Sequence, residues 1–454
     1  MPRYIYQEIR RSVRDKAEII RISCVFLPVR CASNDLTMRT TLKFAAFATV
    51  FVPVAAVLAA GSGVFDLEIG DSERKGRHAP VVLDGITDTG TGDLLTPGEL
   101  AERLADTRIL FIGEDHTDMD FHRVQVRVLE ELHRAGREVM VGLEMYPYTR
   151  QESLDEWSEG SLTEEEFVES SGWYESWGYR WDYYRRIFLF ARDNGIPMFG
   201  VNIPRDHVRT VRTEGFEGLS AEQAAHMPER VDTDSDEHRQ LFRAYFEDDD
   251  AVHAAISAEQ WDGMFRAQCT WDAAMGWNAQ MALEQHGGED AIMVVLIGAG
   301  HVTYGLGAER QIEDAFAGRI TSLVPVPIRD GDNEPVHQVR ASYADFVWGV
   351  PPETAPAYPS LGVSLMGAVG SSPTQVIQVS DDSVAQRAGI KVGDVLLQLD
   401  RSELDSIVSL SKLIAGYDWG DSAVLRFERD GEIQTLDLHF RRVPADTHNK
   451  RERE

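Results

Sequence analysis

The stretch RILFIGEDH, residues 108–116, passes from an apolar segment directly into two acids and a histidine. The apolar part is short and rich in β-branched and aromatic residues, which predicts a buried strand and not a helix. After Thr117 and Asp118, apolar residues recur at a helical spacing as far as Gly136. We therefore expect His116 in a strand-to-helix turn, at the sheet edge where open α/β folds bind ligands.

The same pattern recurs at three further apolar runs, each of which ends in a polar residue. Residues 139–143 end at Glu144, residues 197–201 end at Asn202, and residues 291–297 end at the sequence GAGH, residues 298–301. Parallel strands present their carboxyl ends at one edge, so we expect these polar residues to gather there. Strands alternating with helices predict an α/β domain, a mostly parallel sheet with flanking helices, over about residues 95–349.

Composition restricts the classes of partner. The 454 residues include 45 Lys and Arg against 75 Asp and Glu, a net charge of −30, which argues against nucleic acid and anionic membrane surfaces as partners. Of the three cysteines, only Cys269 lies beyond the first 60 residues, so no internal disulfide framework is expected. The chain contains no Cys-x-x-Cys-His, Gly-x-Ser-x-Gly or P-loop motif, which excludes covalent c-type haem and gives serine-esterase and nucleotide-binding functions no support.

The N-terminal residues 1–60 are expected to be an upstream extension followed by a signal peptide that starts at about residue 38. Arg39 and Lys43 precede an apolar stretch, and small residues follow it. This order predicts export, to the periplasm or out of the cell, with an uncleaved N-terminal anchor as the alternative. Residues 61–94, rich in Gly, Asp and Thr, are expected to be a loose lead-in.

The densest run of aromatic residues lies between residues 173 and 184. Aromatic side chains at this density either pack a core or form the wall of a pocket for a large planar ligand, and the sequence leaves both open. Haem binding needs an axial His, Tyr or Met and a broad apolar slot, and residues 145–184 can supply both.

The ordered set of motifs resembles the ChaN-like haem-binding domain of the Tiki superfamily over about residues 95–325. The residues that carry the resemblance are GEDH at 113–116, His122, Gln125, GLEM at 142–145, Gln151, Leu154-Asp155, Gly172-Trp173, NIPR at 202–205, Gln268, Asp272 and GAGH at 298–301. ChaN-like members are bacterial proteins linked to haem binding and iron uptake. Tiki-like members are divalent-metal-dependent peptidases, so the resemblance implies one of two activities.

For the peptidase activity, the resemblance implies metal ligands at His116, Glu144 and His301. Two imidazoles and a carboxylate suit zinc, manganese, cobalt or iron, with open positions left for water or substrate. Glu114 or Asp115 would then act as general base or orient an imidazole, and the alternative for both acids is capping the following helix.

The haem ligand of the family has no motif that can be matched in this chain. The haem-binding candidates are Tyr146, Tyr148, Trp173 and Trp177. Supporting roles around the site are expected for His122, Asn202, Arg205, Gln268 and Asp272.

A Pro-rich linker, residues 350–359, is followed by short strands and one helix. SVA at 383–385, AGI at 388–390, VGD at 392–394 and VLLQLD at 395–400 resemble a bacterial PDZ domain. The resemblance spans residues 360–442 and predicts a small, β-rich α+β domain before a charged tail, residues 443–454. It implies capture of a protein C-terminus by strand addition, through Leu361, Gly362, Val363, Ser364, Leu365, Ile407, Leu410 and Ile414.

The sequence therefore predicts an exported protein that binds haem or an iron complex for iron uptake and also binds a peptide through its PDZ domain. One alternative is a divalent-metal-dependent peptidase or hydrolase whose PDZ domain presents substrates. Another is a non-catalytic PDZ adaptor, against which the intact pair of Gly-x-x-His motifs argues. Whether the chain is an enzyme, which metal it would use, its PDZ partner and its oligomeric state are left open.

Overall fold

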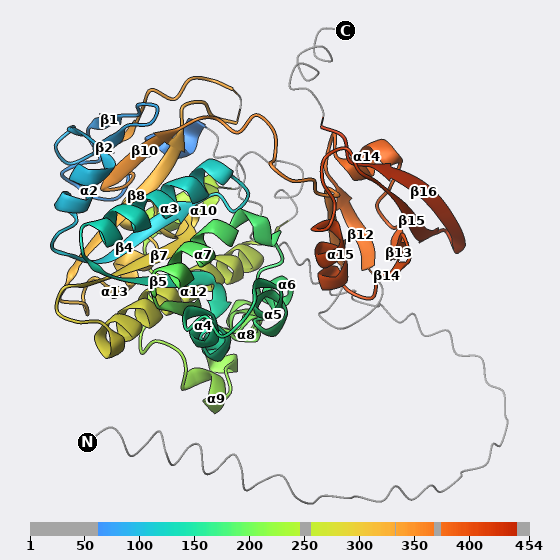
Figure 1. Ribbon diagram of the computed structural model, residues 1–454, viewed down its shortest axis with the longest axis horizontal. Coiled ribbons are helices and arrows are strands. Elements are labelled where there is room, and N and C mark those ends of the chain that lie inside the picture. Colours follow the sequence, from blue (N-terminus) through green and yellow to red (C-terminus); the bar gives the residue numbers. More distant parts are fainter. Residues whose placement is uncertain (1–61, 246–255, 332, 367–373, 443–454) are drawn as a thin grey trace, which may run out of the picture. The chain divides into compact units, whose positions relative to one another are not determined.

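The computed structural model describes residues 62–245, 256–331, 333–366 and 374–442. An α/β region and a C-terminal β-rich region each have a hydrophobic core of their own (Figure 1). The segment predicted to be a signal peptide lies outside the described residues. Among the helices in these four ranges, none has the length and apolar character needed to cross a membrane.

The α/β region is organised around one large sheet. Its strands are β2 (Ile86–Asp88), β3 (Leu94–Leu95), β4 (Thr107–Glu114), β5 (Glu138–Pro147), β6 (Met198–Asn202), β7 (Ala291–Gly298), β8 (Arg319–Pro327) and β10 (Phe346–Val350). They form an eight-stranded sheet in the order β3-β2-β10-β8-β4-β7-β5-β6. Neighbours from β10 to β6 are parallel, and β2 and β3 join one edge antiparallel. The predicted mostly parallel α/β fold is confirmed.

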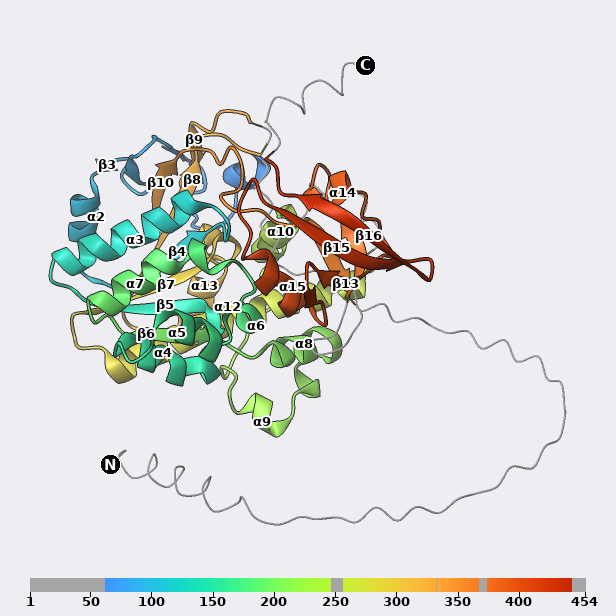
Figure 2. The same ribbon diagram turned by 45° about the vertical axis from the view of Figure 1, so that its right-hand side comes forward.

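Helices cover both faces because the central strands are apolar on both sides. Along β4, Leu110 and Ile112 join the core on one face, and Ile109 and Phe111 join the core on the other. The first core includes residues of α2 (Pro97–Arg103), α3 (Met119–Arg134), α4 (Gln151–Ser158), α5 (Glu164–Ser170), α6 (Trp173–Ser176) and α7 (Arg185–Asp193). Figure 2 shows α3 and α7 side by side on this face.

The opposite face is dominated by one long helix. The second core includes residues of α10 (Asp236–Ala244), α12 (Ala258–His286) and α13 (Ala308–Ile312). Two further helices, α8 (Arg205–Glu214), which packs against α12, and α9 (Ala221–Ala224), follow β6. Since α12 contacts β5, β6 and β7, it brings its own polar side chains to the carboxyl ends of those strands.

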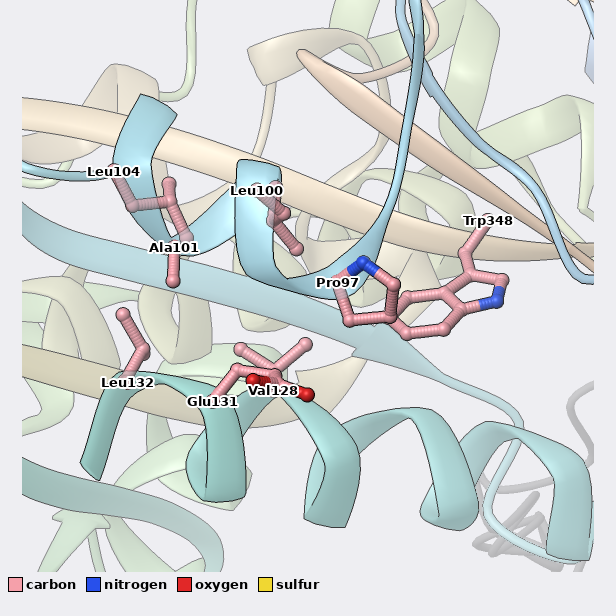
Figure 3. A pocket seen from close by; sticks show the side chains of 8 residues that line it. All are labelled: Pro97, Leu100, Ala101, Leu104, Val128, Glu131, Leu132 and Trp348. Atoms are coloured by element: carbon pink, nitrogen blue, oxygen red, sulfur yellow. The ribbon is translucent and has the colours of Figure 1, made fainter. Parts of the chain in front are cut away.

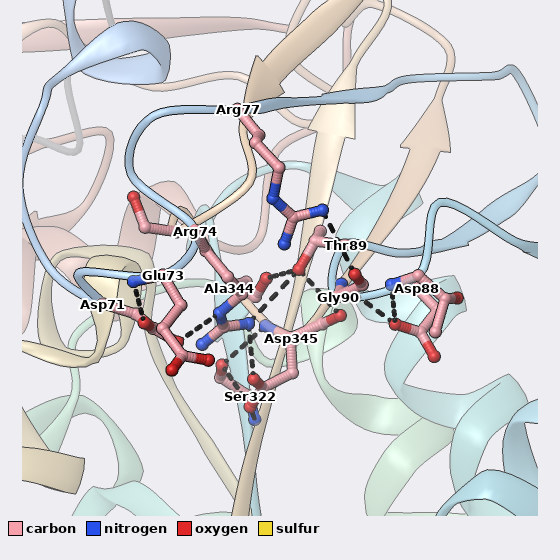
Figure 4. A network of polar contacts seen from close by, with 12 residues as sticks. Asp71, Glu73, Arg74, Arg77, Asp88, Thr89, Gly90, Ser322, Ala344 and Asp345 are labelled. Atoms are coloured by element: carbon pink, nitrogen blue, oxygen red, sulfur yellow. Dashed lines mark hydrogen bonds and ion pairs between the residues drawn. The ribbon is translucent and has the colours of Figure 1, made fainter.

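The lead-in before α2 is built into the fold, so its prediction as a loose segment was wrong. It contains η1 (Ser62–Asp66), β2, β3 and β1 (His78–Pro80), which pairs with β9 (Gln338–Arg340). Arg74 forms an ion pair with Asp345 at 2.8 Å, and the second carboxylate oxygen of Asp345 accepts a hydrogen bond from the backbone N–H of Ser322 (Figure 4). These strands are only two or three residues long, and β1 and β2 pair with β9 and β10, which are distant in sequence, so no local pattern reveals them.

The C-terminal region is an antiparallel sheet with two helices. Its elements are β11 (Val363–Met366), β12 (Thr374–Val379), α14 (Val384–Ala388), β13 (Val395–Leu399), β14 (Ser402–Glu403), α15 (Ile407–Ile414), β15 (Ser422–Arg429) and β16 (Glu432–His439). The strand order is β11-β12-β13-β15-β16, with β14 paired to β13, so β11 lies at an edge. This confirms the predicted β-rich α+β architecture.

Candidate functional site at the carboxyl edge of the sheet

Three side chains meet where β4, β5 and β7 end. His116 follows β4, Glu144 belongs to β5, and His301 closes η5 (Ala299–His301) directly after β7. The Nε2 atom of His301 lies 3.6 Å from Oε1 of Glu144. A Cβ on Gly298 would lie 3.4 Å from Nε2 of His116 and 3.6 Å from Oε2 of Glu144. The side chains of His116 and Glu144 thus lie against Gly298, whose backbone N–H donates a hydrogen bond to Glu144 at 2.6 Å, and His301 lies beside the same carboxylate.

The imidazole of His116 is held by a buried carboxylate. Its Nδ1 lies 2.8 Å from Oε1 of Glu114, which also accepts a hydrogen bond from the Tyr184 hydroxyl at 2.6 Å. The other oxygen of Glu114 accepts from the Gln125 amide at 2.5 Å. Burial alone would raise the pKa of Glu114, but the hydrogen bond with His116 and the charges of His122 and His116 lower this pKa to about 2. Glu114 therefore remains ionised and orients the imidazole.

A second, similar pair holds His301. Its Nδ1 lies 2.5 Å from Oδ1 of Asp272, a fully buried residue of α12, and 2.9 Å from the amide of Gln268 one turn earlier. Burial acts to lower the pKa of His301, but the charge and hydrogen bond of Asp272 outweigh it and raise the pKa. The other oxygen of Asp272 lies 3.5 Å from Nε2 of His238, whose pKa burial lowers to about 4.

In both carboxylate–histidine pairs the same ring nitrogen, Nε2, is left to face Glu144. Because each carboxylate engages an Nδ1 atom, Nε2 is the nitrogen left to act in the site. Nε2 of His116, Nε2 of His301 and the carboxylate of Glu144 have the chemistry to hold a divalent metal or to transfer protons. Within the part of the chain that the structure describes, no three His, Cys, Asp or Glu side chains stand close enough to form a metal site, so the metal-ligand role stays a prediction.

The other predicted polar residues mainly hold the backbone around this site. Asp115 accepts hydrogen bonds from the N–H and hydroxyl of Thr117, at 3.1 and 3.2 Å, so it closes the turn and does not orient an imidazole. The supporting residues bond to carbonyl oxygens, His122 to that of His116 at 3.2 Å, Asn202 to that of Glu144 at 2.9 Å and Arg205 to that of Ser176 at 2.8 Å.

Some residues of the aromatic run pack in the core, and others lie beside the site. Trp177 and Tyr179 lie beside His116, with ring centroids 4.7 and 5.3 Å from the imidazole. Trp173 and Tyr146 are fully buried in the first core, and the Tyr146 hydroxyl is bonded to Ser171 at 2.7 Å. The predicted haem-binding role of Tyr146 and Trp173 does not fit these core positions, because neither side chain is accessible to a ligand.

Two functional contacts escaped the sequence analysis. Tyr184 belongs to the aromatic run, where nothing distinguishes a ring that packs from a hydroxyl that binds Glu114. His238 lies in an acidic helical segment, and only the fold brings it to Asp272. A spacing pattern could not have found either residue.

The hollow drawn in Figure 3 lies apart from these side chains. It is lined by residues of α2, the C-terminal half of α3 and Trp348, and Glu131 is the one charged member of the lining. His116 precedes the opposite end of α3, so this hollow belongs to the packing between helix and sheet.

The residues predicted to bind a peptide lie on β11 and α15. Val363 and Ser364 pair with Val379 and Gln378 of β12, which leaves the other side of β11 without a strand in the described residues. Gly362, just before β11, has φ +74°, a conformation that favours glycine. Leu361, Leu365, Leu410 and Ile414 are buried in the core of this region, and Ile407 is partly buried against it.

Comparison with known proteins assigns both regions. Residues 100–312 match the family model for haem-binding uptake proteins, Tiki superfamily, ChaN, and residues 359–440 match the model for PDZ domains. The chain therefore carries a ChaN-like domain of the Tiki superfamily followed by a PDZ domain, as the motifs predicted.

Individual relatives are distant. The structure titled cofacial heme binding to ChaN of Campylobacter jejuni is 17% identical, with a TM-score of 0.46, over 59% of this chain and 98% of that one. An HtrA-type protease AlgW with decapeptide is 23% identical, with a TM-score of 0.17, over 19% of this chain and 30% of that one. RETICULATA-RELATED 5, a chloroplastic protein of Arabidopsis thaliana, is 26% identical over 126 residues, which cover 26% of this chain and 17% of that protein.

Proposed function

We propose that the ChaN-like domain binds haem or a related iron complex and that the protein serves iron acquisition. The family match over residues 100–312 carries this proposal. Tyr148 supports it, because the side chain is partly exposed and its hydroxyl makes no hydrogen bond to another described residue. Bound haem would supply an iron centre that needs an axial His, Tyr or Met from the protein.

The test is a titration of the purified chain with haemin, followed by absorbance. We expect a change of the Soret band that saturates at a fixed stoichiometry. A change that grows without saturation, as with haemin adsorbed to any protein, would contradict the proposal.

Export is the second part of this proposal. It is supported by the order of charges, apolar residues and small residues from Arg39 to Ser62. Fractionation of the native host and N-terminal sequencing should recover a chain that begins near Gly61 outside the cytoplasm. Recovery of the intact Met1 form in the cytoplasm would refute export.

The alternative function is hydrolysis at the sheet edge, favoured by the two carboxylate–histidine pairs around Glu144. Here Glu144 would accept a proton from an attacking water and the imidazoles would stabilise developing negative charge. A bound divalent metal would supply a more acidic water and would be held by Nε2 of His116 and His301 with Glu144.

This alternative is tested with reporter peptides, with and without Mn²⁺ or Zn²⁺. Turnover by the wild type that is lost in His116→Ala and kept in His133→Ala, an exposed histidine of α3, would support it. Turnover that survives His116→Ala would assign the hydrolysis to another site or a contaminant.

A further inference from the structure

Beside the carboxylate–histidine site lies an arginine that forms no ion pair with a described residue. Arg205, the first residue of α8, donates a hydrogen bond from its guanidinium to the backbone carbonyl of Ser176 at 2.8 Å. A guanidinium has five N–H donors, and no carboxylate in the described part of the chain is bonded to this one. The side chain keeps contact with solvent, so a ligand can reach its remaining donors.

Tyr179 lies between this arginine and the carboxylate–histidine site in electrostatic terms. Its ring centroid is 5.3 Å from that of the His116 imidazole. Burial, and then the charges of Asp115 and Glu144, raise the pKa of its hydroxyl, so both carboxylates lie within electrostatic reach. Partial burial lowers the pKa of Arg205, and the Tyr179 hydroxyl acts in the opposite direction. Arg205 and Glu144 are therefore both neighbours of one tyrosine at the same edge of the sheet.

The turn that carries Arg205 is fixed to the strand that carries Glu144. The amide of Asn202, at the end of β6, donates to the backbone carbonyl of Glu144 at 2.9 Å and accepts from the backbone N–H of Ile203 at 2.8 Å. Strands β5 and β6 are parallel neighbours, and α8 packs against α12, the helix that carries Asp272. The position of Arg205 is thus set by the same framework that holds the carboxylate–histidine pairs.

The charges around Tyr179 differ between a buried and an exposed side. Glu144 is buried and makes the inner side acidic, so it repels a second carboxylate. Arg205 is exposed and supplies a positive charge. Asp206, the next residue, is already bonded to His207 at 3.1 Å and to the amide of Gln223 at 3.3 Å. A ligand with a negative end and an uncharged end is therefore favoured in one orientation, with its negative end at Arg205.

We propose that the sheet-edge site takes short peptides with a free C-terminus and that Arg205 binds their terminal carboxylate. The inference rests on the proposed hydrolysis at this site and adds its substrate class. Arginine suits this role because the planar guanidinium can form two parallel hydrogen bonds with one carboxylate. With the carboxylate held at Arg205, one of the last peptide bonds is directed past Tyr179 towards Glu144 and the two imidazoles.

The experiment titrates the full chain, without added metal, with N-acetyl-dialanine and with its C-terminal amide. The NMR signal of the His116 imidazole is followed, because it reports the sheet edge and not the PDZ domain. We expect the wild type to bind the free acid about five- to tenfold more tightly than the amide, since the amide loses charge-assisted hydrogen bonds. Arg205→Met should abolish this preference by weakening the acid alone. Arg205→Lys should keep part of it, because an ammonium retains the charge but not the planar geometry.

Arg209→Met is the matched control. Arg209 is an exposed arginine one turn later on α8, so the variant removes the same charge from the same helix. It should keep the preference of the wild type for the free acid. Turnover of the two peptides, measured separately with Mn²⁺ or Zn²⁺, should show the same order of kcat/KM among these variants.

The outcomes separate this inference from the proposed hydrolysis. Saturable binding that prefers the free acid, without turnover, would contradict hydrolysis and support Arg205 as the carboxylate-binding residue. Turnover or binding without any preference for the free acid would overturn the inference and leave hydrolysis to its own test. A preference that persists in Arg205→Met, or an equal weakening of acid and amide in that variant, would overturn the role of Arg205. The absence of a saturable shift of the His116 signal with the free acid would overturn it as well.

Discussion

At the scale of single residues, the centre of the ChaN-like domain is a carboxylate without solvent contact. Glu114 is fully buried and ionised, with three neighbouring side chains, His116, Tyr184 and Gln125, bonded to its two oxygens. A buried charge is tolerated only when its hydrogen bonds are complete, so each of these partners contributes to stability as well as to the position of His116.

Tyr184→Phe tests this dependence. Removal of the hydroxyl leaves Glu114 with one donor fewer, and we expect a loss of about 1–3 kcal/mol in unfolding free energy at neutral pH. The pKa of Glu114 is lowered on folding, so its stabilisation is present above its ordinary value of 4.5 and is lost as pH falls towards about 2. The difference between wild type and variant should therefore shrink over that range in urea unfolding. Tyr148→Phe is the control, since its hydroxyl has no described partner, and an equal loss there would contradict the argument.

Gly298→Ala tests the space between His116 and Glu144. Gly298 has φ −54° and ψ 138°, which alanine adopts freely, so the backbone should not be strained. The new Cβ would lie 3.1 Å from Cε1 of His116 and must push the ring aside. We expect a change of about 1 kcal/mol or less in stability, a displaced His116 imidazole signal in NMR spectra, and loss of any turnover at this site.

Gly300→Ala is the matched control for that experiment. Its Cβ would lie 3.7 Å or more from the nearest atoms, those of the Tyr245 ring, which is ordinary contact. Turnover and NMR spectra that change equally in both variants would show that the Gly298 position has no special effect.

At the scale of elements, the strands that carry the site residues could be predicted from the sequence. The helices that supply the remaining site residues could not. Each of β4, β5, β6 and β7 contains an apolar run with a polar residue at or just after its carboxyl end, and their parallel order brings these residues to one edge. Asp272 reaches His301 only because α12 crosses the ends of β5, β6 and β7. Its orientation depends on packing over the whole helix, which a local pattern does not contain. Tyr146 shows the same limit, since an aromatic residue after a strand suits a core as well as a pocket.

The contact between the lead-in and α13 provides a prediction about pH. Glu309 of α13 lies near Asp345, Glu313, Arg74 and Asp71. Burial, reinforced by the charge of Asp345, raises its pKa from 4.5 to about 8. A raised pKa means that its contribution to stability is complete below pH 4.5 and is lost as pH rises through about 8.

Glu309→Gln keeps the shape of the side chain and removes the titration. We expect the Tm of the variant, relative to that of the wild type, to increase as pH is raised from about 5 to about 9. For a domain of this size each kcal/mol corresponds to about 2–4 °C. Thermal unfolding at several pH values measures this difference, and parallel curves for the two proteins would contradict it.

At the scale of the whole chain, a ChaN-like domain is joined to a PDZ domain that has its own core. Both domains could be assigned from motifs, because their diagnostic residues lie next to a strand in the sequence, as a glycine before it or a polar residue after it. The residues that select the ligand of each domain are not marked by such local motifs. The PDZ specificity is expected to depend on the side chains of α15 and β11.

The PDZ domain is expected to bind the free C-terminus of another protein. An incoming strand can add to the open edge of β11, and Gly362 lets the preceding backbone turn so that N–H groups can face a carboxylate. Apolar residues of α15, of which Ile407 is partly buried, should favour a hydrophobic last residue of the peptide.

We expect about micromolar affinity of the full chain for such peptides, because a short peptide is ordered on binding. Amidation of the peptide C-terminus should weaken binding by about tenfold or more, since charge-assisted hydrogen bonds are lost. Ile407→Lys should weaken it similarly, and Val392→Lys, at a position 65% exposed in the same domain, should not. Fluorescence anisotropy with paired free and amidated peptides measures both effects, and equal binding of the two forms would show that the carboxylate is not recognised.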